Sequence, residues 1–149
     1  MNAFQKWLLL GSSAATALTG IVYAWMKYLM TPIEPWAVIN HPLQPWMLKA
    51  HIVVAPVMVF ALGLIATGHI WAHFRSGLSV RRRTGITTMA VLVPMVFTGY
   101  LIQAVTHAGW LQAMVLGHLV TSGLYVLGLG GHWLVAGGRS VRQEQRPEP

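Results

Sequence analysis

The sequence predicts an all-α membrane protein built as a transmembrane four-helix bundle. Of its 149 residues, 55% are hydrophobic and only 9% are charged, whereas soluble proteins carry about 25% charged residues. The apolar residues gather in four stretches of about twenty or more, each long enough as a helix to cross ~30 Å of hydrocarbon. Lys and Arg flank these stretches. We therefore expect a single membrane domain over residues 1–149.

The helices are expected at about residues 7–30, 46–74, 84–105 and 110–136. The first stretch follows a basic start and resembles a signal peptide, but its length favours a retained membrane helix. Prolines interrupt the connector that follows it, and a basic loop over 75–83 separates the second and third helices. Gly137 and Gly138 are expected to end the fourth helix, which leaves a polar tail over 139–149.

The basic residues predict the orientation. Two of them, Lys27 and Lys49, fall on one side of the predicted bundle, and the other eight fall on the opposite side. By the positive-inside rule, both termini and the basic loop are cytoplasmic. The second and fourth helices then run parallel to each other.

Composition excludes several kinds of site. Cys is absent, so the sequence allows no disulfide, thiolate metal site, iron–sulfur cluster or covalent c-type haem attachment. The acids are Glu34, Glu144 and Glu148, without any Asp, so no pair of carboxylates can act as general acid and base. We assign no catalytic residue. The net charge is +7, but the basic residues lie at helix ends, so we expect no nucleic-acid partner.

Histidines inside two of the apolar stretches are the candidate functional residues. His118 and His132 are fourteen residues apart, so as helix residues they share one face at a separation of ~21 Å. His51 and His69 are eighteen residues apart, which is about five turns and again one face. Because an ionisable side chain inside a membrane is costly without a partner, these histidines are predicted to be functional.

The two pairs fall at matching depths. Measured from the tryptophan that begins each helix, His51 is level with His118 to within ~5 Å, and His69 with His132 to within ~2 Å. Two imidazoles that face each other at each of two levels can ligate the iron of two bis-histidine haem b groups. His73 is an alternative to His69 as the inner ligand, and it otherwise lies near a propionate or a quinone. Alternatively, the histidines are polar contacts between helices or belong to a zinc or copper site, although zinc needs clustered ligands.

Small and basic residues complete the predicted haem sites. Gly85 and Gly99 on the third helix repeat the fourteen-residue interval and would let a porphyrin edge pass. Gly11 and Gly20 offer similar room on the first helix. Close helix packing is the other interpretation of these glycines.

Cations and outer histidines have two interpretations each. In one interpretation, Lys49 and Arg75 pair with haem propionates. In the other, they only set the orientation of the helices in the membrane, and their side chains extend to the membrane–water interface. His41 and His107 are either solvated loop residues or contacts of a quinone, which we consider as a second cofactor.

The pattern over Trp46 to Ala136 resembles the small four-helix, di-haem b-type membrane cytochromes. These are the cytochrome b subunits of bacterial quinone-linked oxidoreductases and related four-helix cytochrome b domains. The pattern is also similar to the haem core of the cytochrome b of quinol:cytochrome c oxidoreductases. This chain departs from it on the second helix, where eighteen residues replace fourteen. The resemblance implies two haem b groups, each with two histidine ligands, and electron transfer across the membrane.

We therefore expect a multi-pass subunit of the bacterial cytoplasmic (inner) membrane. It would carry electrons between the quinone pool and a partner such as a periplasmic c-type cytochrome or an iron–sulfur or molybdenum protein. Within such an oxidoreductase complex it would be a non-catalytic or quinone-reactive subunit, in contact with membrane lipid. Two alternatives stay open. In the first alternative, the chain is a non-redox anchor or assembly subunit of a larger complex. In the second, it is a histidine-using metal or proton transporter.

Overall fold

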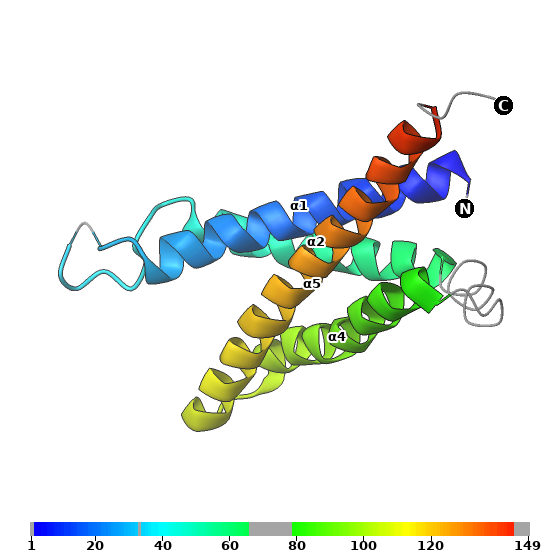
Figure 1. Cartoon of the computed structure of the whole chain (residues 1–149). Coiled ribbons are helices and arrows are strands. Elements are labelled where there is room, and N and C mark those ends of the chain that lie inside the picture. The colour runs from blue at the N-terminus through cyan, green and yellow to red at the C-terminus, as the bar shows by residue number, and fades with distance from the viewer. Residues whose placement is uncertain (1, 33, 66–78, 145–149) are drawn as a thin grey trace, which may run out of the picture. The chain divides into compact units, whose positions relative to one another are not determined.

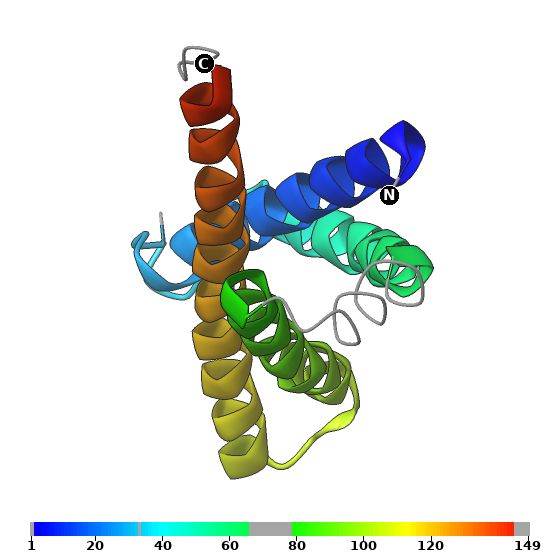
Figure 2. The same cartoon turned by 45° about the vertical axis from the view of Figure 1, so that its right-hand side comes forward.

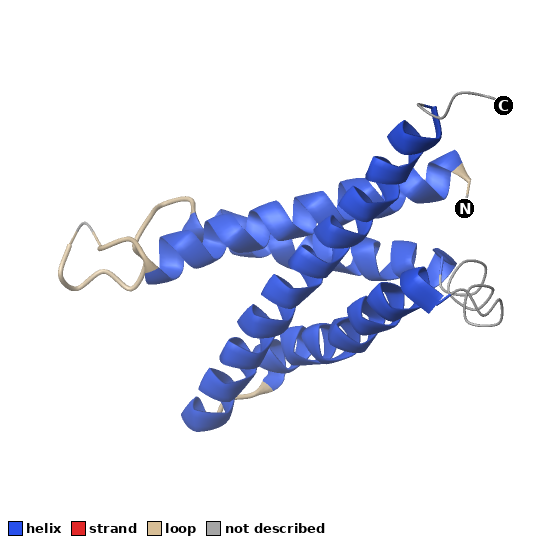
Figure 3. Cartoon of the chain, in the orientation of Figure 1, coloured by secondary structure: helices blue, strands red, loops and turns tan. Residues whose placement is uncertain are grey.

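The computed structural model describes residues 2–32, 34–65 and 79–144, with side chains outside 79–86 and 132–144. In these ranges the chain forms four helices and no strand (Figure 3). The helices are α1 (Ala3–Tyr28), α2 (Gln44–Ile65), α4 (Ser79–Ala104) and α5 (Ala108–Glu144). Each contains a segment long and apolar enough to cross a membrane, which confirms the all-helical fold class with four candidate spans.

The helices pack in consecutive pairs. α1 packs against α2, and α4 packs against α5 (Figures 1 and 2). The chain divides into two compact units at Ala72 and His73, so each pair belongs to one unit. We call α1 with α2 the first hairpin and α4 with α5 the second hairpin.

A capping box begins the first hairpin. The Asn2 side chain accepts a hydrogen bond from the Gln5 backbone N–H at 2.8 Å, and the Gln5 side chain accepts one from the Asn2 N–H at 3.2 Å. These bonds satisfy backbone donors that the first turn leaves without partners inside the helix. They explain why α1 begins four residues before the expected boundary at residue 7.

The seam of the first hairpin combines small polar residues with apolar ones. On α1 the side chains of Ser12, Ser13 and Thr16 are buried. The buried apolar residues of α2 include Met58 and Ala61, of which Ala61 is only 1% exposed. Small residues let two membrane helices approach closely, and this approach provides much of their van der Waals attraction.

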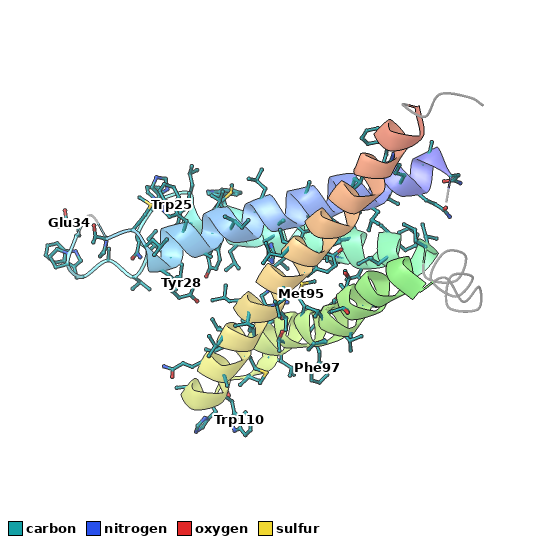
Figure 4. The ribbon with its side chains drawn as sticks, in the orientation of Figure 1. Trp25, Tyr28, Glu34, Met95, Phe97 and Trp110 are labelled. Atoms are coloured by element: carbon teal, nitrogen blue, oxygen red, sulfur yellow. The ribbon has the colours of Figure 1, made fainter. Side chains whose placement is uncertain are left out.

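Asn40 joins the described part of the connector between α1 and α2 to the end of α1 and to the start of α2. The Asn40 side-chain amide donates to the carbonyl oxygens of Lys27 at 3.0 Å and Met30 at 2.9 Å, at the end of α1. The Asn40 backbone N–H donates to the buried Gln44 side chain at 3.0 Å. The bond to Lys27 satisfies a carbonyl group in the last turn of α1, which has no partner within the helix. Glu34 lies at the far end of this connector (Figure 4).

The second hairpin has a mostly apolar seam and a short turn at residues 105–107. Leu92 and Met95 of α4 are buried, as is Tyr125 of α5, which is 3% exposed. Met95 is labelled in Figure 4, where it lies on α4 beside α5. None of the described Ser or Thr residues of this hairpin is buried, whereas the first hairpin buries Ser12, Ser13 and Thr16.

Two boundaries of the second hairpin differ from those expected. α4 already begins at Ser79, so part of the predicted basic loop over 75–83 is helical, because arginine is a good helix former and neither Gly nor Pro interrupts 79–84. α5 continues through Gly137 and Gly138 to Glu144, past the expected end at 136 and into the predicted tail. Glycine costs a helix about 1 kcal/mol relative to alanine but does not break it.

Candidate functional site

His51 is bound to the opposite helix of its own hairpin. Its Nδ1 lies 3.0 Å from the carbonyl oxygen of Thr16 and 3.3 Å from the hydroxyl of Thr19, both on α1. A carbonyl oxygen only accepts hydrogen bonds, so Nδ1 must be the donor. The Thr19 hydroxyl donates to the Ala15 carbonyl at 2.7 Å, which leaves its oxygen lone pairs able to accept from the imidazole.

Gly20 makes this position of the imidazole possible. A Cβ atom built on Gly20 would lie 2.8 Å from Cε1 and 3.1 Å from Nδ1 of His51. Carbon atoms in van der Waals contact are about 3.5–4.0 Å apart. Any side chain at position 20 would therefore push the ring away from α1 or force the helices apart.

His118 repeats this arrangement in the second hairpin. Its Nδ1 lies 2.9 Å from the carbonyl oxygen of Met95 and 3.5 Å from the hydroxyl of Thr98, both on α4. The Thr98 hydroxyl donates to the Pro94 carbonyl at 2.7 Å. A Cβ on Gly99 would lie 3.0 Å from Cε1 of His118 and 3.3 Å from Nδ1.

We call this arrangement a histidine seat. It consists of a backbone carbonyl, a threonine three residues later and a glycine one residue after that, all on the helix opposite the histidine. The first seat is Thr16, Thr19 and Gly20, which hold His51. The second is Met95, Thr98 and Gly99, which hold His118.

The seats determine which ring nitrogen can bind a metal. In a neutral imidazole one nitrogen carries the proton and the other carries a lone pair. Because the carbonyl holds the proton on Nδ1, the lone pair of each neutral ring is on Nε2. Metal-binding histidines commonly donate their second N–H to a backbone carbonyl, which fixes the tautomer and the ring orientation. Both rings therefore fit the donor chemistry of a haem iron ligand.

Gly99 and Gly20 are the predicted glycines for which the structure shows a neighbour. In both cases the neighbour is the imidazole of the seated histidine. At Gly11, by contrast, no described atom outside the local helix backbone lies within 4 Å of the position that a Cβ would take. Direct contact of Gly99 with a porphyrin stays a prediction.

The other predicted site residues are only partly described. His69, His73 and Arg75 lie outside the described residues. Gly85 belongs to α4 and His132 to α5, but their side-chain surroundings lie outside what the structure describes. His51 and His118 belong to different hairpins, so their pairing stays a prediction.

The remaining polar candidates have local contacts. The Lys49 ammonium lies 5.0 Å from the ring centroid of Trp46, a cation–π arrangement within α2. The His41 Nδ1 accepts a hydrogen bond from the Leu43 backbone N–H at 3.1 Å, so it helps to shape the connector. His107 is exposed in the turn before α5. The propionate and quinone roles of these residues stay predictions.

No group of three His or Glu side chains gathers in the part of the chain whose side chains are described. Comparisons with protein-family models, curated proteins and solved structures found no match for the chain.

Proposed function

We propose that this protein is a di-haem b-type cytochrome subunit that carries electrons across a membrane. The observation that supports this most directly is the pair of seats, because two membrane-spanning hairpins each hold one histidine as the Nδ1–H tautomer. A histidine with a purely structural role needs only one hydrogen-bond partner, and that partner does not have to be the same group in both hairpins. Two histidines held by the same three groups are better explained by a common task at Nε2.

In the proposed arrangement His51 and His118 ligate one haem, and His132 ligates the other with His69 or His73. When bound, haem b supplies a reversible one-electron redox centre. The chain's own residues orient the ligands. The carbonyl oxygens of Thr16 and Met95 hold the Nδ1 protons, and such bonds fix the tautomer and the orientation of the ring. The apolar spans exclude water from the site.

The setting of this activity is part of the proposal. The charge distribution favours cytoplasmic termini in a bacterial inner membrane. The chain would exchange electrons between quinone and a partner protein on the outer face, such as a c-type cytochrome or an iron–sulfur or molybdenum protein. Lys49 and Arg75 would interact with the propionates, and Gly85 and Gly99 would lie at the two haem levels.

An optical spectrum of the purified protein tests the proposal. We expect the sharp α and β bands of reduced bis-histidine haem b and two haems per chain. His118→Ala should remove one haem and keep the other, and His41→Ala, a connector histidine, serves as the matched control. A colourless protein would overturn the proposal in favour of the anchor or transporter alternatives. Two haems retained in His118→Ala would overturn the ligand assignment alone.

A further inference from the structure

The two histidine seats occupy equivalent positions in their hairpins. Each seat lies on the first helix of its hairpin, and the histidine lies on the second. Gly20 and His51 are 31 residues apart, whereas Gly99 and His118 are 19 residues apart. The difference of twelve residues equals the difference between the connector after α1, which has fifteen residues, and the turn after α4, which has three. The helical residues between glycine and histidine therefore have the same total length in both hairpins.

The sequences of the two histidine helices repeat in the register that places His51 on His118. In this register residues 46–64 of α2 coincide with residues 113–131 of α5 without a gap. The identical pairs are Met47 and Met114, His51 and His118, Val53 and Val120, Val59 and Val126, Leu62 and Leu129, and Gly63 and Gly130. A shared helical period explains apolar residues at matching positions, but it does not require the same residue at both.

The exposure of these helices follows the same register. Throughout residues 46–58 of α2, each residue is buried, partly buried or exposed as its counterpart in residues 113–125 of α5 is. Met58 and Tyr125 are counterparts, and both are 3% exposed. The histidine helix therefore presents the same face to its neighbour in each hairpin, although the buried side chains differ in chemistry.

The helices that carry the seats agree in the same way. A shift of 79 residues places Thr19 and Gly20 of α1 on Thr98 and Gly99 of α4. The same shift pairs buried residues with buried residues, namely Ser13 with Leu92 and Thr16 with Met95. Both helices of the first hairpin thus have a counterpart of matching burial in the second.

We infer that the chain is a tandem repeat of one histidine-presenting hairpin, in which the connector after α1 contains twelve residues more than the second copy. The repeat units are residues 9–25 with 46–64 and residues 88–104 with 113–131. Each unit contains a single histidine, which is the seated one. The common task of the unit is therefore to present one imidazole from a seat on the neighbouring helix.

The repeat separates the seated histidines from the other candidate ligands. In the same register, position 132 of the second hairpin coincides with Ile65 of the first, which is apolar and buried. On the proposed function, His51 and His118 are therefore equivalent ligands, as the two axial positions of one haem require. The repeat itself does not rest on the proposed function, because it compares only protein residues.

The test exchanges the segments that link the helices in the detergent-solubilised full chain. Replacing residues 26–45 with the sequence of residues 105–112 removes a net twelve residues and keeps the inferred register. We expect His51 to stay in its Nδ1–H form, with its ring ¹⁵N resonances at their original shifts. The matched control is the same replacement without Gly109. It moves α2 out of register by one residue, or about 100° around the helix, and should lose this hydrogen bond.

A reciprocal variant decides the question if the shortened chain does not fold. It carries the sequence of residues 26–45 in place of residues 105–112, and longer surface loops cost little stability. We expect His118 to keep its Nδ1–H form in this variant. Loss of that form from His118 here, or from His51 in the folded in-register variant, would overturn the repeat. A control without Gly109 that keeps His51 in its seat would overturn it as well.

Haem loading gives a second readout, which rests on the proposed function. A histidine that loses its second hydrogen-bond partner typically binds metal about 10-fold to 100-fold more weakly. The control without Gly109 should therefore bind the haem of His51 that much more weakly, whereas the in-register variant should bind it as the unmodified chain does. A colourless protein would overturn the proposed function, while the tautomers would still decide whether the two hairpins are equivalent.

Discussion

The two hairpins hold their histidines in the same way but differ in almost everything around them. In the first hairpin the seam includes buried hydroxyls, and the long connector is held by Asn40. In the second, the seam includes Leu92 and Met95, and the turn is short. The residue whose carbonyl binds the imidazole is polar Thr16 in one and apolar Met95 in the other. The seat therefore depends on backbone carbonyl, threonine and glycine rather than on the surrounding packing.

The fourteen-residue interval also leads to different kinds of residue in the sequences of the two hairpins. In the second hairpin this interval leads from Gly99 to Gly85 and from His118 to His132. In the first it leads from Gly20 to Lys6 and from His51 to Ile65, a buried apolar residue. On the proposed function, an inner haem ligand from the first hairpin therefore does not follow the fourteen-residue interval.

The largest expected effect comes from removing a seated ligand. On the proposed function, His51→Ala and His118→Ala should each lose the same single haem, and the double variant should lose no more than that one. Haem stoichiometry and the reduced spectrum of the three variants check this. If the double variant lost both haems while each single variant lost one, the two histidines would belong to different haems.

Adding a methyl group at the glycine that faces each seated imidazole should have the next largest effect. Gly20→Ala and Gly99→Ala would place a Cβ at 2.8 Å and 3.0 Å from the respective imidazole Cε1, so both should weaken haem binding by about 10-fold to 100-fold. The closer approach predicts the larger effect at Gly20. Haem titration of the apo-protein measures it.

Gly63→Ala is the matched control for these two variants, because outside the local helix backbone no atom of the described residues lies within 4 Å of a Cβ at that position. It should bind haem like the unmodified chain. Equal haem affinity in Gly20→Ala and Gly63→Ala would contradict the role given to the seat.

Truncating Asn40 should destabilise the first hairpin alone. Asn40→Ala removes two side-chain hydrogen bonds to carbonyls at the end of α1, each contributing about 0.5–1.5 kcal/mol to the free energy of unfolding. Limited proteolysis should cut the connector faster, while the turn before α5 keeps its original rate. If Asn40→Ala were as stable as the unmodified protein, the Asn40 side-chain hydrogen bonds would not contribute to the stability of the first hairpin.

The smallest effect, and one of opposite sign, is expected at Thr16. Thr16 is 8% exposed, and among the described residues its hydroxyl oxygen has no hydrogen-bond partner. Because an unsatisfied buried polar atom costs about 1–3 kcal/mol, Thr16→Val, which keeps the shape and the carbonyl, should be neutral or stabilising. Ser12→Ala is the contrast, since the Ser12 hydroxyl donates to the Leu8 carbonyl at 2.7 Å. Denaturant unfolding measures the free energy of unfolding of both variants. A clear loss of stability in Thr16→Val would contradict this prediction, because it would mean that the Thr16 hydroxyl makes a stabilising hydrogen bond.

Much of the fold followed from the sequence because span length and hydropathy are properties of consecutive residues. The four described helices overlap the four expected spans, and the expected part of the second helix over 66–74 lies outside the described residues. Their ends were harder to predict, since charge was taken as a signal for a loop at Arg81–Arg83 and glycine as a signal for a helix end at Gly137 and Gly138. Basic residues set the topology of a membrane helix without ending it, and the cost of two glycines is small in a long helix.

The candidate site could be predicted only in part. His51 and His118 were identified because a histidine in an apolar span is unusual. The seats were missed because they depend on which residue of one helix faces which residue of the next, and a single sequence does not reveal that register. A signal was nevertheless present. The Thr-Gly dipeptide occurs four times in the chain, at 19–20, 67–68, 84–85 and 98–99.

Each described seat is completed by two helices that are consecutive in the chain, and this bears on biogenesis. Synthesis proceeds from the N-terminus, and N-terminal units generally fold first. The bond between His51 and the Thr16 carbonyl can therefore form while the second pair of helices is still on the ribosome. On the proposed function, the tautomer of the first ligand is set before its partner has been translated. Cofactor insertion then awaits only the arrival of the second imidazole.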